Sequence, residues 1–140
     1  MSNAIPGPGF LLQVDDGTLT FTTITEVKEV KALPLSVDTV DVTNQSSPGG
    51  YEEIVPTIRR SGETTFDVNF VPNDATHDSV TGLQYLLNNK LKRSYQLIIP
   101  GASTKPRWTG YVVGFDITAP VAGVLSAAVK VKVTGQPTWV

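Results

Sequence analysis

The sequence predicts a mainly β domain, built as a β-sandwich or barrel with one α-helix packed on its flank. Short runs of β-branched and aromatic residues recur along the chain, and turn-forming residues separate them. Only one segment carries leucines at helical spacing. With 140 residues, 40% of them hydrophobic, the chain is long enough for one domain with its own core.

The chain is predicted to begin with a flexible arm over residues 1–9, followed by a single domain over residues 10–140. Residues 6–9 read PGPG, and such a stretch forms neither a helix nor a central strand. Residues 15–17 read DDG, which is a hairpin turn signal between two apolar runs. The strands expected in this half cover residues 10–14, 19–24, 24–31 and 36–43, with a short helix as the alternative over 24–31.

The longest irregular region is predicted at residues 44–63. It begins with the turn-forming sequence NQSSPGG. Residues 51–58 are alternatively a short extended or hairpin segment, which Pro56 would confine to a sheet edge. A loop of this length in a compact domain is usually functional or disordered. The region also has apolar residues that a solvated loop does not need: Tyr51, Ile54, Val55 and Ile58. We therefore expect it to be mobile in the free chain and to become ordered on binding.

The second half is predicted to contain the helix, at about residues 75–92. Asp74 or Thr76 can cap its start. Its apolar stripe consists of Leu83, Leu86, Leu87 and Leu91. Further strands are expected at residues 64–71, 94–99, 108–117 and 125–133. In the strand at 108–117, one apolar face is expected to consist of Tyr111, Val113, Phe115 and Ile117.

Charge is distributed unevenly along the chain, although the net charge is only −2. Residues 1–70 carry ten acids and four bases, whereas residues 71–140 carry three acids and seven bases. The net charge provides no global basic field that would recruit nucleic acid. The asymmetry is either chance scatter or a sign of oppositely charged surfaces suited to head-to-tail contact between copies.

The residues show no pattern typical of a catalytic or metal site, so we predict no enzyme, no cofactor and no metal. The chain has no cysteine, which excludes disulfides and thiolate zinc sites. His77, the only histidine, is expected at the surface. No apolar run approaches the roughly 20 residues that span a bilayer, so no membrane contact is expected. Trp108 and Trp139 are interpreted as core or interface anchors rather than base-stacking residues.

A series of short motifs extends over nearly the whole chain. In the first half these are FTTITEV at residues 21–27, DVT at 41–43 and RSGETTF at 60–66. In the second half they are VPN at 71–73, YQLIIPG at 95–101, WTGYV at 108–112 and VKVTGQP at 131–137. Each motif is weak alone, but in this order the chain resembles the tail tube proteins of lambda-like siphophages, the long-tailed phages with non-contractile tails.

The resemblance implies a fold of two packed sheets flanked by one helix and a long loop, similar to contractile-tail tubes and the type VI secretion tube. It implies a structural virion protein that self-assembles into hexameric rings, which stack into the tail tube and form the channel for ejection of genomic DNA. Some relatives carry a further C-terminal immunoglobulin-like domain. None is expected here, because the sequence stops at Val140 just after its Gly-x-Pro segment.

The resemblance also implies partners and a location. The partners are other copies of the chain, the tape measure protein, the tail tip or baseplate and the tail terminator, with only transient, non-specific passage of DNA. The location is the virion tail, assembled in the cytoplasm of the host bacterium.

Two sets of residues are candidates for these functions. DNA must slide through the channel without sticking, which favours an acidic lining. The candidates are Asp38, Asp41 and Asp67, with an acidic outer wall as the alternative. The long loop is expected to lie across a neighbouring subunit, where Arg59 and Arg60 would meet acids. The alternative is that the loop folds back over the core of its own domain.

Three other functions are also compatible with the residues. The first is a tail terminator or baseplate ring protein of the same fold, which forms one ring and stops. The second is a type VI secretion tube subunit. The third is a carbohydrate-binding β-sandwich or an enzyme. It would require polar or aromatic side chains that converge on one face, and the sequence pattern indicates no such set.

Overall fold

The computed structural model describes residues 9–18 and 20–140, over which the chain forms ten strands, one α-helix and one short 3-10 turn. The mainly β fold with one helix is therefore confirmed. Of the predicted flexible arm, all but Gly9 lies outside the described residues.

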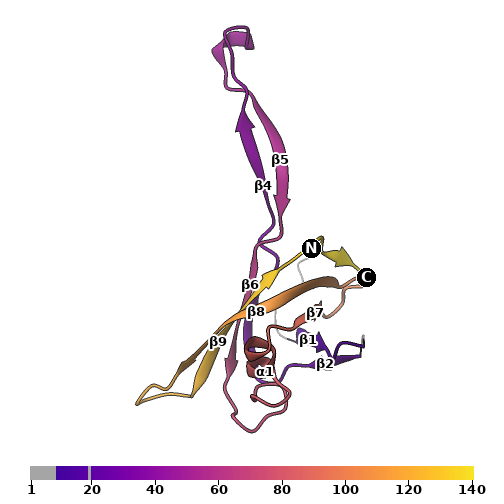
Figure 1. Ribbon diagram of the computed structural model, residues 1–140, viewed down its shortest axis with the longest axis vertical. Helices are drawn as coiled ribbons and strands as arrows, with labels where there is room; N and C mark the ends of the chain where they lie inside the picture. The colour runs from indigo at the N-terminus through magenta and orange to yellow at the C-terminus, as the bar shows by residue number, and fades with distance from the viewer. Residues whose placement is uncertain (1–8, 19) are drawn as a thin grey trace, which may run out of the picture.

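One curled antiparallel sheet makes up the body of the molecule (Figure 1). Its strands are β1 Leu11–Asp15, β2 Phe21–Thr23, β3 Val27–Lys31, β6 Glu63–Asn69, β7 Lys92–Ile98, β8 Pro106–Thr118, β9 Ser126–Val133 and β10 Thr138–Trp139. They follow the order β2-β1-β7-β8-β9-β6-β3, and β10 pairs with β8 beside this path. β1 and β3, near opposite ends of the path, contact each other, so the sheet closes around one core.

The core lies between the inward faces of these strands and the helix α1 (Leu83–Asn88), which contacts β8. Apolar side chains that alternate along the strands meet here, and their burial stabilises the fold. Trp108 and Tyr95, which are opposite each other on β8 and β7, stack with ring centroids 6.4 Å apart. The buried apolar residues are Leu12, Ile24, Phe66, Val68, Leu83, Leu86, Tyr95, Trp108, Val112, Ala127, Val129 and Val131.

The helix is shorter than predicted, because α1 covers only Leu83–Asn88 and residues 75–82 form turns. Asp78 explains the late start. Its carboxylate accepts hydrogen bonds from the backbone N–H groups of residues 80–82, which holds this segment in a turn instead of a helix. The early end coincides with Lys90, whose φ of 55° is incompatible with a right-handed helix.

His77 is fully buried, so its expected surface position is wrong. Its Nδ1 accepts a hydrogen bond from the backbone N–H of Val71 at 3.2 Å, and its Nε2 donates to the carbonyl oxygen of Thr25 at 2.8 Å. The side chain points inward because the residues around it form turns, and the helical spacing used to place it does not apply. His77 thus connects the turns before α1 to the segment between β2 and β3.

The apolar face predicted for β8 is also wrong. Three of the four residues assigned to it are largely exposed: Tyr111, Val113 and Ile117. The buried side chains on β8 are instead those of Pro106, Trp108 and Val112. The register against β9 shifts directly after Val112, and this irregularity interrupts the simple alternation of faces.

Candidate self-assembly surface

The two strands outside the main sheet, β4 (Ser36–Asp41) and β5 (Ile54–Arg60), form a separate two-stranded hairpin that projects from the body (Figure 1). Residues 54–60, in the second half of the region predicted as irregular, thus form a strand, which agrees with the extended or hairpin alternative for residues 51–58. The segment does not fold back over the core of its own domain, so that alternative to contact with a neighbouring subunit is wrong. Val40 lies opposite Val55, and the pairing continues toward the tip through a bond from the Val42 N–H to the Glu53 carbonyl oxygen at 2.9 Å.

The hairpin presents apolar side chains with no core beneath them. All seven residues of β5 are exposed, and so are five of the six in β4. The large apolar residues exposed along the hairpin and at its base are Leu35, Val37, Val40, Val42, Tyr51, Ile54, Val55 and Ile58. A two-stranded hairpin alone is marginally stable in water. Exposed apolar surface of this extent is typical of an interaction site.

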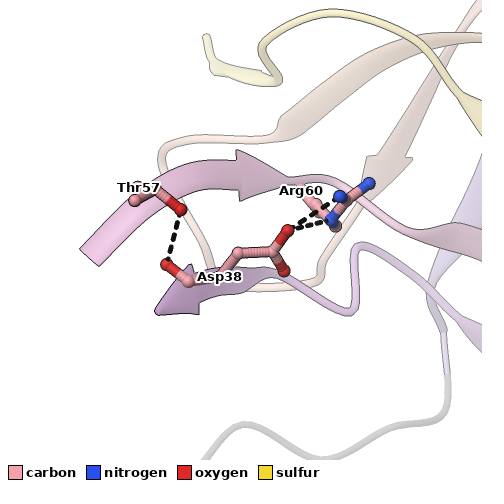
Figure 2. A network of polar contacts seen from close by, with 3 residues as sticks. All are labelled: Asp38, Thr57 and Arg60. Atoms are coloured by element: carbon pink, nitrogen blue, oxygen red, sulfur yellow. Dashed lines mark hydrogen bonds and ion pairs between the residues drawn. The ribbon is translucent and has the colours of Figure 1, made fainter. Parts of the chain in front are cut away.

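Figure 2 shows how one ion pair fixes the base of this hairpin. Arg60 contacts the same oxygen, Oδ2 of Asp38, through Nε at 2.8 Å and through Nη2 at 2.7 Å. The Thr57 hydroxyl donates to the backbone oxygen of Asp38 at 3.1 Å. These contacts span a register irregularity between the strands. The Arg60 hydrogen bond lowers the pKa of the Asp38 carboxyl, so both groups are charged and paired within one chain.

The six loop candidates named from the sequence lie together on this hairpin, whereas the three acidic candidates do not form one surface. Asp38 and Asp41 are on β4, and Asp67 is on β6 in the body. Asp41 accepts a hydrogen bond from the Thr43 backbone N–H at 2.8 Å. Hydrogen bonds from the Thr43 side chain and backbone lower the pKa of Asp41. Arg59, in contrast to Arg60, makes no ion pair with any described residue.

Asp67 lies on the outward face of the curled sheet, because its neighbours Phe66 and Val68 are buried in the core. On β3, β6 and β9 this face carries acids and bases in equal number: Glu29, Glu63 and Asp67 with Lys31, Lys130 and Lys132. On β2, β1, β7 and β8 it carries a hydrogen-bonded row of polar side chains: Thr23, Gln13, Gln96 and Arg107. The face is thus polar and nearly balanced in charge.

A cleft of about 600 Å³, which we call the basal cleft, lies where the hairpin meets the C-terminal segment. The hairpin side contributes Leu35, Ser36, Val37, Arg59, Arg60 and Ser61, and the C-terminal side contributes Gly135, Gln136, Pro137 and Trp139. Trp139 is 62% exposed, so of the two tryptophans only Trp108 belongs to the core.

Other kinds of site find no support in the described part of the chain. Within residues 9–18 and 20–140, no three side chains of His, Cys, Asp or Glu are grouped so that they could hold a metal ion. In the same residues, no helix has the length and apolar character needed to cross a membrane.

Solved structures with this fold come from several tail and injection assemblies. A chain from the tail of an empty gene transfer agent particle, refined with C6 helical symmetry, has a TM-score of 0.81 and 21% identity, covering 98% of this chain and 99% of that one. A chain from the sheath/tube terminator of the PVC extracellular contractile injection system has a TM-score of 0.75 and 14% identity, covering 99% and 97%. The SPP1 tail tube protein has a TM-score of 0.72 and 10% identity, covering 97% and 78%.

At these identities the structural likeness shows a common fold. No sequence among curated proteins matches the chain. A family model described as the lambda phage tail tube protein, however, matches residues 14–140. The resemblance inferred from the sequence motifs is thereby confirmed, and with it the structural role in a phage-type tail. Because the match covers most of its length, the chain belongs to the lambda phage tail tube protein family.

Proposed function

We propose that this tail tube protein closes into hexameric rings that stack into a tube, and that the tube forms the channel for ejection of DNA. The observation that carries the proposal is the projecting β4–β5 hairpin. It exposes a row of apolar residues to water, which is unfavourable in a monomer and is relieved by contact with another chain. The sheet also ends in β2 and β3, and the free side of each can pair with a neighbouring copy. The C6 symmetry of the gene transfer agent tail supports six subunits per ring.

For the wall of the channel we propose the outward face of the curled sheet. On β3, β6 and β9 this face carries Asp67 among equal numbers of acids and bases, and on β8 it carries both Asp116 and Arg107. The face therefore offers DNA phosphates little net attraction. Of the three acidic candidates, only Asp67 would contribute to this wall. Asp38 and Asp41 belong to the hairpin, and Asp38 is neutralised by Arg60.

The wider assembly follows from the same proposal. We place the tape measure protein inside the tube, and the tail terminator and the tail tip or baseplate at its ends. Chains of the same fold in a sheath/tube terminator and in a baseplate support contacts of this kind. We assign the protein to the virion tail, with assembly in the bacterial cytoplasm and a purely structural, non-enzymatic role.

Imaging of the purified protein tests this function. Negative-stain electron microscopy over a range of concentrations should show rings with a central channel and, at high concentration or with a tail-tip seed, stacked tubes. Monomers or dimers alone under all these conditions would contradict the proposal.

A second candidate, a terminator or baseplate ring protein, is favoured by the likeness to a chain in a structure of the PVC sheath/tube terminator. The same images separate the two functions, because a terminator would form single rings that do not stack.

A further inference from the structure

We infer that the tip of the β4–β5 hairpin of one copy docks in the basal cleft of the next copy, where the acids of the tip meet Arg59. This inference rests on the proposed function and identifies the receiving surface of the contact. The tip consists of residues 42–53, and the basal cleft is the one lined by Arg59 and Trp139.

The walls of the cleft are held in place by hydrogen bonds between its two sides. The Ser61 hydroxyl, at the end of the hairpin, donates to the carbonyl oxygen of Gly135 at 2.9 Å. Further along, the backbones of Val140 and Lys105 exchange two hydrogen bonds of 2.8 and 2.9 Å. These bonds fix the C-terminal segment beside the hairpin base, so the cleft exists before a partner arrives and little ordering entropy is lost on docking.

Large apolar side chains are exposed on both halves of the proposed contact. In the cleft, Trp139 is 62% exposed and Leu35 is 61% exposed. At the tip, Tyr51 is 77% exposed. Aromatic residues that become buried at the centre of an interface contribute a large share of its binding free energy. Tyr51 is therefore the side chain best suited to fill the cleft.

The charges of the two halves are complementary. The hairpin from residue 39 to residue 58 carries three acids, Asp41, Glu52 and Glu53, and no base. The cleft is lined by two arginines and no acid. Arg60 is already paired with Asp38, whereas Arg59 forms no ion pair with a described residue and is free to meet an acid from outside. Such complementarity fixes the orientation of a contact and accelerates its formation.

The occupant must come from another copy. A strand rises about 3.3 Å per residue, so the six residues of β4 place the tip roughly 20 Å from the cleft at the base of the same hairpin. Each copy thus carries one tip and one cleft on separate parts of its surface. A contact of this kind is heterologous, and it can be repeated from copy to copy without limit.

Disulfide trapping tests the contact directly, because the chain contains no cysteine of its own. In the double variant Tyr51→Cys and Gln136→Cys, oxidation of assembled tubes should produce a ladder of covalent multimers on a denaturing gel. The matched control, Tyr51→Cys with Asn89→Cys at the exposed end of α1, should remain monomeric on the gel. Tubes that are intact in electron micrographs but give no ladder would overturn the docking site and leave the proposed function standing.

Charge reversal provides a second test of the docking contact, and this test does not depend on Tyr51. Arg59→Glu, or Glu52→Lys with Glu53→Lys, should raise the critical concentration for tube formation about tenfold, and the combination should largely restore it. Lys90→Glu makes a similar charge change away from the cleft and should have no effect. Reversed variants that assemble at the wild-type concentration would contradict the docking. A wild-type protein that forms no tubes at all would contradict the proposed function instead.

Discussion

His77 acts as an internal connector: each of its ring nitrogens forms a hydrogen bond with the backbone of a different segment. The variant His77→Phe keeps a ring of similar size but leaves the Val71 N–H and the Thr25 carbonyl without their partner. An unsatisfied buried polar group costs about 1–3 kcal/mol. We therefore expect a clearly lower midpoint of urea unfolding for His77→Phe. Ser79→Ala, an exposed position in the same turns, should leave the midpoint unchanged, and an unchanged midpoint in both variants would refute the connecting role.

Asp74 makes the stability of the fold depend on pH in the acid range. Its carboxylate accepts hydrogen bonds from the hydroxyls of Thr76 and Thr25 at 2.6 and 2.7 Å. These bonds, with one from the Thr76 backbone, lower the pKa of Asp74 from 3.8 to about 2. Since the folded pKa lies below the unfolded one, the contribution is complete above the unfolded value and is lost as the pH falls toward 2.

Urea unfolding of the wild type and of Asp74→Ala between pH 7 and pH 2.5 measures this contribution. The difference in unfolding free energy between the two proteins should be constant near neutral pH and should shrink below about pH 4. A difference that keeps its full size down to pH 2.5 would show that these hydrogen bonds do not favour the charged form.

At the scale of the secondary-structure elements, the β4–β5 hairpin is separable from the body. None of its residues belongs to the buried core. Deletion of residues 46–53 should therefore leave the melting temperature of the monomer nearly unchanged while abolishing tube formation in electron micrographs. As a contrast, Leu12→Ala in the core should cost about 2–5 kcal/mol of stability. If the deletion variant unfolds, or still forms normal tubes, the hairpin is not the assembly element.

The elements that were predictable from the sequence are those with one buried face. β6 and β9 alternate between the core and the outside, and this alternation is visible in the residues themselves. β5 has no buried face and contains Pro56, so its pattern allows a short hairpin segment without distinguishing it from a loop. The helix start was missed because Asp78 binds the backbone of residues 80–82, and this competing interaction is not apparent from leucine spacing.

The candidate surface was likewise predictable only in part. The apolar residues that stood out in a polar stretch, such as Tyr51 and Ile58, do lie on the projecting element. The pairing of Arg60 with Asp38 depends on the register between two strands, which neither residue indicates alone. The basal cleft was missed entirely, because it joins residues 35–37 to a C-terminal segment about 100 positions later, and no local pattern links them.

At the scale of the whole molecule, the balance of charge on the outward sheet face can be tested with DNA. Asp67→Lys changes the net charge of this face by two per subunit, which gives twelve in a ring of six. Tubes of this variant should bind double-stranded DNA in a salt-sensitive manner, whereas wild-type tubes should not. Co-sedimentation at low and high salt measures the difference. The control is Asn88→Lys with Asn89→Lys, which adds the same charge at the exposed end of α1. Equal DNA binding by both variants would place Asp67 outside the channel wall.

The β4–β5 hairpin projects from one side of the body only, as Figure 1 shows. A rod in which every subunit points its hairpin the same way has a direction, like an arrow. One end would present acidic hairpin tips, and the other would present empty clefts, each with one arginine, Arg59, that forms no ion pair with a described residue. A protein that caps one end therefore cannot cap the other, and elongation proceeds differently at the two ends. The direction of the assembled tube is therefore determined by the shape of each identical subunit.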